Sequence, residues 1–544
     1  MASLIGRFLN HLALGPLERK VTEYLNAATC DSVASDLGKV LLPQRWRARG
    51  HLQVIFGQYC IQDSAGEKYW NEDSFRNHIR SAHPESIISD GAVRLLWRSF
   101  HFYAYHPFPR HPQQVTNLDF DAFHRAALLV VFQCDSLLGT RELDWFWRHD
   151  AAFFHNACFA RVFRSLAVPE TATIEQGKSV NQVNDVTPSL SDAMDVLVMV
   201  GPQFIHAMPS ERQLETVARR LFISGPAAER GSARREDVSN LMELLLRLEL
   251  NEEKWGSYYH YGHILQADPA NEEFTEALVD ALMGGENKQV MTPEQLLEAT
   301  CLFPNLPLRF QQLWAVLFQP PMESPCSLPA ASTHIREGVI SLFLPRLSFE
   351  IDFRPREDNQ DTRITFAEVL VSLDSSNLEM SSLNKALSLH SSDHVVLFTG
   401  DTESTRRAVM GVYLPAPSSV INYSLGHTWQ RSSHVFFQLL PTFRLLWGTK
   451  SYARLADLIN TRDKKTSPGD DMQIDNPKTL TVPYWIGDAS GEGVRLKIDP
   501  EKRTVALTGG DAQLRTDLKT KRSNEVAEED EVLIQNARMN LFTV

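Results

Sequence analysis

The sequence predicts an α+β fold, with an all-helical N-terminal region followed by a C-terminal antiparallel β-sandwich with flanking helices. Through most of the first 330 residues apolar side chains recur at helical spacing, as in Leu17 to Leu25 and Val33 to Leu42. From about Glu337 the pattern changes to short apolar runs bounded by turn residues, which is typical of strands. Several strands with few helices between them favour two packed antiparallel sheets.

The helical region contains clear start and stop signals. Pro107 ends one predicted helix after His106, because proline cannot continue a helix. The segment from Asp121 to Cys134 predicts a helix with a nearly all-apolar centre, which indicates burial on most sides. Thr292-Pro293-Glu294-Gln295 predicts a helix start, with threonine as N-cap and glutamine reaching back to it. Leu241 to Leu250 is a further predicted helix.

The C-terminal region alternates apolar and polar residues with a period of two. Arg495 and Lys497 separate Val494, Leu496 and Ile498, which indicates a strand with one buried face. The predicted strands are His394 to Phe398, Ala408 to Leu414, Val435 to Leu440, Phe443 to Trp447, Val494 to Ile498 and a closing strand over Ala537 to Leu541.

Breaks in these patterns predict four parts. The segment 169–190 is rich in threonine, serine, asparagine, glutamine and proline, and it reads as a linker. Prolines at 320, 321 and 325 end the second helical region. The predicted parts are 1–168, a helical, degenerate EF-hand-like region; 169–190, a linker; 191–330, a second helical region; and 335–544, the sandwich.

Composition argues against a nucleic-acid partner. The 544 residues include 54 Lys or Arg and 67 Asp or Glu, for a net charge of −13. Such a chain repels phosphate backbones unless its basic residues are concentrated, and the sequence has no dense basic block. An apolar fraction of 43% is ordinary for a globular protein, so most of the chain can bury a core.

Cysteine use and the first residues predict a cytoplasmic protein. The six cysteines lie far apart without a CxxC pair, as expected of reduced thiols and not of a zinc site. The N-terminus lacks the charged-then-apolar order of a signal peptide, and Ala2 stands where N-myristoylation requires glycine. No apolar run approaches the roughly 20 residues of a membrane span, so we expect at most peripheral membrane association.

A calcium loop is the first candidate site. When Gly66 is aligned with the obligatory loop glycine, Ile61, Asp63, Ala65 and Glu72 occupy the first, third, fifth and twelfth positions. Ile61 and Ala65 supply no side-chain oxygen, so the cation would be under-coordinated. We therefore predict a degenerate, structural hand and no metal site, with a calcium-regulated adaptor as an alternative.

The run from Gly487 to Gly493 is the second candidate. It lies between two predicted strands and carries two acids, so a glycine-rich turn is favoured over a phosphate cradle. A surface loop on a rigid sheet suits partner contact. The predicted partner-binding residues are Gly487, Asp488, Gly491 and Gly493.

No catalytic or cofactor-binding residues are predicted. The chain has no Gly-x-Ser-x-Gly elbow before a helix, and no local motif activates Cys301. His260 and His263 lie three apart, but Gly262 weakens any helix there, so a loop is favoured over a metal site. The clearest basic patch, a candidate for weak contact with an acidic lipid or protein, comprises Arg515, Lys519, Lys521 and Arg522.

The strand-forming blocks of the C-terminal region resemble those of the TLDc domain, in order and spacing. The blocks are HVVLFTGD (394–401), AVMGVYLP (408–415), SSHVFFQLLPTFRLLW (432–447), YWIGDASGEGVRLKID (484–499) and a closing strand. N-terminal segments at 67–75, 102–109 and 118–123 are similar to a branch containing the fungal restriction-of-telomere-capping protein and the animal lysosomal mTOR-associated TLDc protein. Ala2 and the end of the chain, Met539 to Phe542, depart from that branch, which has glycine and Glu-Val-Trp there.

The resemblance implies a non-enzymatic interaction protein. It implies binding to V-ATPase subunits, an influence on pump assembly, on vacuole or lysosome function or on the oxidative-stress response, and peripheral association with the vacuolar or lysosomal membrane. It also implies an EF-hand-like helical region before the TLDc domain. An antioxidant or hydrolytic enzyme acting through the TLDc domain is the alternative.

Overall fold

The structure, a computed structural model, describes residues 2–42, 46–84, 88–108, 117–139, 148, 151–168, 187–202, 207–222, 231–254, 260–293, 295, 302–320, 334–344, 368–373, 378, 383, 385, 387, 393–414, 434–447, 459–460, 483–487, 494–508 and 532–543. The chain divides into two compact units. Unit 1 comprises Met1–Asp268, Leu282–Gly338 and Ser348–Asp361; unit 2 comprises Pro269–Ala281, Val339–Leu347 and Thr362–Val544. The four predicted parts stay predictions, although this division joins the two predicted helical regions in one unit.

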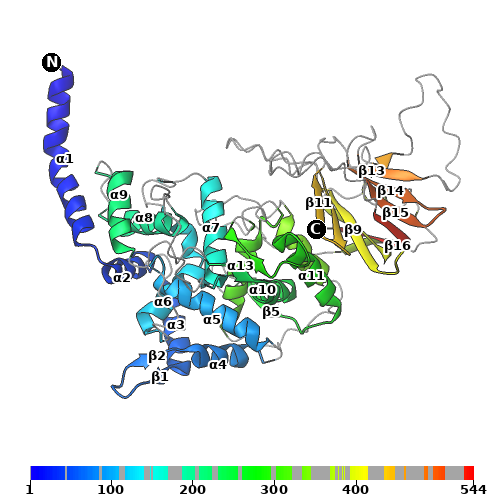
Figure 1. Ribbon diagram of the computed structural model, residues 1–544, viewed down its shortest axis with the longest axis horizontal. Coiled ribbons are helices and arrows are strands. Elements are labelled where there is room, and N and C mark those ends of the chain that lie inside the picture. Colours follow the sequence, from blue (N-terminus) through cyan, green and yellow to red (C-terminus); the bar gives the residue numbers. More distant parts are fainter. Residues whose placement is uncertain are drawn as a thin grey trace, which may run out of the picture. The chain divides into compact units, whose positions relative to one another are not determined.

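Unit 1 is mainly helical (Figure 1). Its helices are α1 (Ala2–Ala27), α2 (Cys30–Leu41), α3 (Trp46–Tyr59), α4 (Glu72–Ala82), α5 (Asp90–Tyr105), α6 (Phe120–Ala126), α7 (Ala151–Leu166), α8 (Pro188–Val200), α9 (Glu211–Leu221), α10 (Arg235–Arg247) and α13 (Leu306–Leu317). A π-helical turn, Ala127–Val131, continues α6, and a 3₁₀ turn spans Cys134–Leu137. Helix α8 begins inside the segment predicted as a linker.

Local signals place several helix ends where the sequence predicts them. Helix α5 ends at Tyr105, directly before His106-Pro107. Thr292 and Gln295 form the predicted capping box, since the Gln295 side chain accepts from the Thr292 amide at 2.9 Å and the Thr292 hydroxyl accepts from the Gln295 amide at 3.5 Å. The apolar segment after Asp121 is buried from Ala122 to Phe132, as its composition predicts.

The N-terminal unit is not all helical, which corrects the prediction. It contains the antiparallel pairs β1 (Ile61–Gln62) with β2 (Lys68–Tyr69), β3 (Ala233–Arg234) with β6 (Val290–Met291), and β4 (Leu248–Lys254) with β5 (His260–Ile264). The segment predicted as one helix over 241–250 ends at Arg247 and continues as β4. Long-range pairing with β5 outweighs the helix propensity of two leucines and a glutamate.

Two helical hairpins, α3 with α4 and α5 with α6, are joined by one backbone bridge. Trp70 and Leu118 exchange two hydrogen bonds of 2.8 Å immediately before α4 and α6. Each following helix has a side-chain N-cap: Asn71 accepts from the Ser74 amide, and Asp119 accepts from the Ala122 amide. Trp70 is fully buried, and the centre of its ring lies 4.5 Å from that of the tilted Phe123 ring, so the two hairpins share one core.

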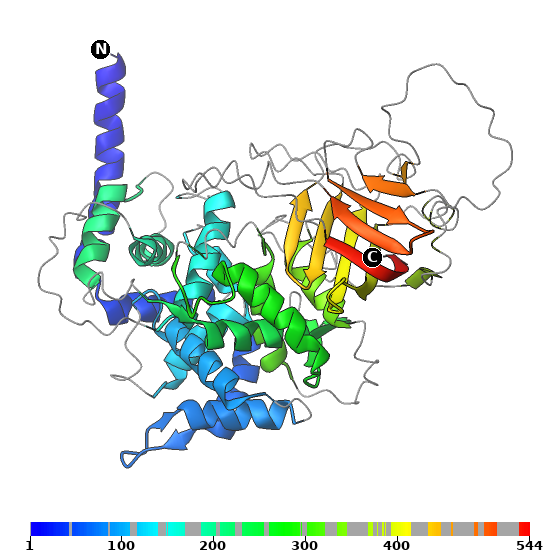
Figure 2. The ribbon, with the colours of Figure 1, turned by 45° about the vertical axis from the view of Figure 1, so that its right-hand side comes forward.

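Unit 2 is built on one continuous antiparallel sheet (Figure 2). Its strands are β7 (Glu368–Leu373), β8 (His394–Asp401), β9 (Arg407–Leu414), β10 (Val435–Leu440), β11 (Arg444–Trp447), β12 (Ile459–Asn460), β13 (Tyr484–Gly487), β14 (Arg495–Asp499), β15 (Thr504–Thr508) and β16 (Val532–Thr543). The strand order is β11-β10-β9-β8-β16-β15-β14-β13-β12, with β7 also paired to β16.

The long strand β16 belongs to both halves of this sheet. Its first residues pair with β15, and its residues from Gln535 onward pair with β8 on the opposite edge. Between these stretches the register shifts, and Asn536 adopts a positive φ of 51°, a backbone conformation that asparagine tolerates better than most residues. The last residues pair with β7. The bulge lets β16 turn from one sheet into the other.

The two halves pack face to face, as the sequence predicts for a sandwich. One apolar core joins residues of β8, β9, β10 and β16 to residues of β13, β14 and β15, including Phe436, Tyr484, Leu496 and Ile534. In β14 the predicted alternation is confirmed, because Leu496 and Ile498 are buried and Arg495 and Lys497 are half-exposed.

Helices cover the outer face of the first sheet. The α14 helix (His334–Phe343) places Phe343 with its ring 5.3 Å from that of Phe437 on β10. The α11 helix (Ala270–Met283) places Phe274 under the guanidinium of Arg407 on β9, 5.4 Å away. Because β8, β9 and β10 are buried on both faces, their sequences are continuous apolar runs. The mixed helix-and-sheet architecture confirms the predicted α+β class, and none of the described helices is long and apolar enough to cross a bilayer.

Gly411, at the centre of β9, gives a test of this packing. A Cβ there would overlap the carbonyl oxygen of Val396 and lie 2.8 Å from the Phe437 ring. We expect Gly411→Ala to lower the free energy of unfolding by about 1–3 kcal/mol, because the close-packed sheet has no space for a methyl group. Chemical denaturation followed by fluorescence measures the change.

The control is Gly57→Ala in α3, where no atom lies within 4 Å of the added Cβ. Alanine there should leave stability unchanged or raise it by about 0.5–1 kcal/mol, because glycine is a poor helix former. Equal losses in both variants would contradict the packing argument.

Candidate functional site

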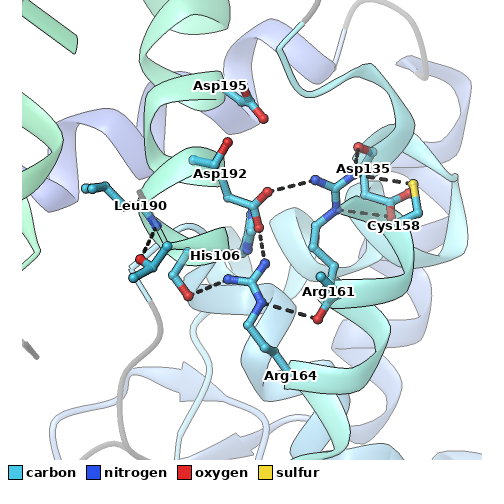
Figure 3. A network of polar contacts seen from close by, with 12 residues as sticks. His106, Asp135, Cys158, Arg161, Arg164, Leu190, Asp192 and Asp195 are labelled. Atoms are coloured by element: carbon cyan, nitrogen blue, oxygen red, sulfur yellow. Dashed lines mark hydrogen bonds and ion pairs between the residues drawn. The ribbon is translucent and has the colours of Figure 1, made fainter. Parts of the chain in front are cut away.

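A concentrated group of buried charges lies in unit 1, where α7 and α8 meet the end of α5 (Figure 3). Helix α8 carries Asp192 and Asp195 three residues apart, and α7 carries Arg161 and Arg164 three residues apart. Residues at this spacing share a helix face, so the two faces can meet. Thr187 caps α8 and Pro188 opens it, which sets the position at which the two carboxylates begin.

Asp192 is the centre of this network. Its Oδ1 accepts from Arg161 at 2.9 Å, and its Oδ2 accepts from Arg164. The carboxylate is fully buried. Burial opposes its charge, but the two guanidinium groups outweigh burial and lower the pKa of Asp192 to about 2. Asp192 therefore stays ionised at neutral pH, and its ion pairs with Arg161 and Arg164 link α8 to α7. The segment of the chain between these two helices lies outside the described residues.

His106, Asp135 and Cys158 complete the network. Nε2 of His106 lies 3.8 Å from Asp192, and neither ring nitrogen has a hydrogen-bond partner among the described residues. Burial lowers the pKa of His106 to about 3, so the ring is neutral. Burial raises the pKa of Asp135 to about 6 and that of the Cys158 thiol to about 11. A protonated thiol 3.3 Å from Arg161 is a packed hydrogen-bonding group and a poor nucleophile at neutral pH.

A third arginine, Arg148, binds Asp195. Arg148 donates to Asp195, to the Ser191 carbonyl at 2.9 Å and to Glu211 on α9 at 2.8 Å. Gly139, with φ +79°, comes so close that a Cβ would lie 2.9 Å from the Asp195 carboxylate. The geometry therefore fixes the positions of α7, α8 and α9, which is an orienting role.

Sequence reasoning missed this network, although a signal was present. Two aspartates in a mainly apolar helix, and two arginines in a mainly apolar and aromatic one, indicate buried ion pairing, because unpaired buried charges are strongly unfavourable. What the sequence does not reveal is which helices pair.

Three histidines gather at the C-terminal end of α13. The ring of His51 contacts the Phe318 carbonyl oxygen at 2.8 Å, and the ring of His78 contacts that of Leu317 at 3.1 Å. His83 is buried beside this turn, and its Nε2 has no hydrogen-bond partner among the described residues. His51 and His78 thus pair with carbonyls that a helix end leaves without partners. Burial lowers the pKa of His78 to about 3 and of His83 to about 4, so both are neutral.

The predicted calcium loop is closed by its own hydrogen bonds. The Asp63 carboxylate accepts from the Ala65 and Glu67 amides, each at 2.9 Å, and Gly66 has φ +87°. One oxygen of the Asp63 carboxylate thus accepts both hydrogen bonds that close the turn. Ile61 and Ala65 offer no ligand, and Glu72 binds Arg76 at 2.6 Å. No cluster of three metal-ligating side chains occurs in the described part of the chain.

Of the predicted partner-binding residues, the structure describes Gly487 alone. It ends β13, is buried and has φ +127°. A Cβ there would lie 2.9 Å from the Phe436 ring, so glycine is needed for the close approach of the two sheets. Asp488, Gly491 and Gly493 lie outside the described residues.

The structure describes some of the remaining sequence candidates. His260 and His263, predicted in a loop, lie on strand β5, because the segment pairs with β4. Cys30 donates its thiol hydrogen to the Leu221 carbonyl at 3.1 Å. Cys301, Cys326 and the basic patch Arg515, Lys519, Lys521 and Arg522 lie outside the described residues.

Removing the charge of Asp192 tests the network. We expect Asp192→Asn to lower the free energy of unfolding by about 3–5 kcal/mol, because the buried Arg161 and the half-buried Arg164 lose their shared anionic partner. Asp36→Asn on α2 is the matched control, since Asp36 pairs with Lys39, which is 71% exposed. That change should cost less than about 1 kcal/mol. Comparable losses in urea denaturation would contradict the central role of Asp192.

The buried histidines make stability fall in acid. The unfolded chain takes up protons near pH 6.5, whereas the folded chain holds the pKa values of His78 and His106 at about 3 and those of His83 and His124 at about 4. Between pH 6.5 and these lower pKa values the unfolded chain therefore binds more protons than the folded chain. The free energy of unfolding consequently decreases as pH falls below 6.5. Asp135 opposes this between pH 3.8 and 6, because its folded pKa is raised.

We expect His78→Gln to reduce the slope of unfolding free energy against pH between pH 6.5 and 4. The reduction is at most about 1.4 kcal/mol per pH unit, because one proton fewer is taken up on unfolding. Urea titrations at a series of pH values measure the slope. A slope identical to that of the unsubstituted chain would show that His78 does not stay neutral in the folded protein.

Comparison with known proteins adds no family assignment. The chain matches no protein-family model, and a search of curated proteins finds no match for it. The resemblance to the TLDc domain therefore stays a prediction from the ordered blocks of the sequence.

Proposed function

We propose that the protein is a non-enzymatic, TLDc-type interaction protein whose β-sandwich binds V-ATPase subunits. In this proposal it acts at the cytoplasmic surface of the vacuole or lysosome as a peripheral protein. It influences pump assembly, and through it vacuolar or lysosomal function and the response to oxidative stress. The helical unit orients or regulates the sandwich during docking.

The observation that carries this proposal is the placement of the resembling sequence blocks. The block at 394–401 is β8, residues 408–414 of the second block lie in β9, the block at 432–447 contains β10 and β11, and the block at 484–499 contains β13 and β14. The closing strand is β16. All of these strands belong to one antiparallel sheet folded over a single core, the kind of rigid scaffold that presents loops to a partner.

The charge network of unit 1 supports the role given to the helices. It uses its arginines and aspartates to fix helices, and its histidine and thiol are neutral and buried. A group of helices held by buried ion pairs makes a stiff body, as positioning a partner requires. This role for the helical unit belongs to the proposal.

Capture of the pump tests the proposal. The tagged full chain is incubated with detergent-solubilised vacuolar or lysosomal membranes, and V-ATPase subunits are quantified in the eluate. We expect enrichment of at least about tenfold over a chain carrying Gly411→Glu, in which a charged side chain meets the backbone of β8 and the sandwich is disrupted.

Loss of capture in that variant, with unit 1 still folded by circular dichroism, would assign binding to the sandwich. Equal recovery of pump subunits with both chains would contradict binding through this unit. Recovery with neither chain would contradict V-ATPase binding itself.

A further inference from the structure

Helix α3 of unit 1 has one face in the core and one face in solvent. Leu52, Ile55 and Phe56 are buried, and the Phe56 ring contacts the rings of Phe120 and Phe123 on α6. The residues between them in the sequence point away from this core and are exposed. The unit therefore uses one side of α3 for its own packing.

The exposed face of α3 is apolar at its centre. Val54 is 66% exposed, and Ile61, two residues beyond the end of the helix, is 37% exposed. These are two of the three large apolar side chains that are exposed in the described part of the chain. From 50 to 61, a stretch that the structure describes in full, none of the exposed residues is charged. Solvated helix faces usually carry charges, so this face is suited to contact with another apolar surface.

Two glycines give this face its shape. Gly50 and Gly57 lie four residues before and three residues after Val54, so all three share one side of the helix. Both glycines are exposed, and no atom of the described residues lies within 4 Å of a Cβ built on either one. Val54 therefore projects between two gaps in which another backbone can come close. Such a surface is complementary to itself, because in an antiparallel helix pair the valine of each copy fits the gap of the other.

The two ends of this face differ in charge. Arg47 and Arg49 lie in the first turn of α3. Asp63 and Glu67, followed by one lysine, Lys68, lie beyond its other end. An antiparallel pair brings the first turn of each helix near the loop of the other, so opposite charges meet at both ends. A parallel pair would bring like charges together, which is unfavourable.

We propose that α3 is the site at which two copies of this chain associate, as an antiparallel helix pair with its two-fold axis beside Val54. The inference concerns self-association through unit 1 and does not depend on the proposed function. A crossing of two short helices covers less than the about 1,200 Å² of a standard interface. The dimer is therefore weak, and its fraction depends on concentration.

The test measures the mass of the full chain by sedimentation velocity, from about 1 to 100 µM, the range in which a weak dimer forms. We expect the dimer fraction of the unsubstituted chain to rise over this range. Val54→Glu should weaken association by at least about tenfold, because it places two like charges at the axis. The matched control is Val290→Glu, which makes the same change at a valine on β6 that is 45% exposed.

A second variant separates fitted packing from general apolar adhesion. Gly57→Leu enlarges the apolar surface where the single chain has space for a side chain, and leucine favours the helix. We expect it to weaken association by several fold, because the side chain fills the gap that receives Val54 of the other copy. Val54→Cys should give a disulfide-linked dimer with oxidised glutathione, whereas Val290→Cys should not.

A chain that stays monomeric over the whole range would overturn the inference, as would equal effects of Val54→Glu and Val290→Glu. Stronger association of Gly57→Leu would show general apolar adhesion and refute the helix pair. Binding of a monomeric chain to phosphatidylcholine vesicles, abolished by Val54→Glu alone, would assign the face to a membrane and refute the dimer.

Discussion

The structure of the C-terminal unit depends on the backbone pairing of its last strand. Strand β16 bonds to β8 along one edge and to β15 and then β7 along the other. Without it the two sheets would each expose a long edge, and one core would not close between them. The bulge at Asn536 makes this possible, because it turns the strand while its inward residues Ile534 and Met539 stay in the core.

Closure by one strand produces two different outer faces. The first sheet is buried on both sides, and its glycine at 411 leaves room for Phe437. The second sheet keeps polar residues such as Arg495 and Lys497 outside, and Gly487 leaves room for the Phe436 ring in the core and for the backbone of β14. Gly487, which the sequence predicts to contact a partner, is itself buried, so its role in the structure is to allow close packing of its neighbours.

In the helical unit, buried charge has the organising role that backbone pairing has in the sandwich. Asp192 and Asp195 hold arginines from elsewhere in the chain, and three imidazoles meet the end of α13. Such contacts are directional, so they favour one arrangement of helices over others that would bury similar apolar area. The bridge between Trp70 and Leu118 does the same for the two hairpins.

The change from helices to strands that the sequence predicts near residue 337 comes later in the chain, because α14 spans His334–Phe343 and the first described strand after it begins at Glu368. The sequence by itself determined the helix stop before Pro107, the capping box at Thr292 and the alternation in β14. These features depend on neighbours within a few residues, where periodicity and capping act. Only the tertiary structure decided that 248–254 is a strand, that Asp192 pairs with Arg161 and Arg164 and that Gly487 is buried. Each of those depends on contacts between segments far apart in the chain, which local patterns do not encode.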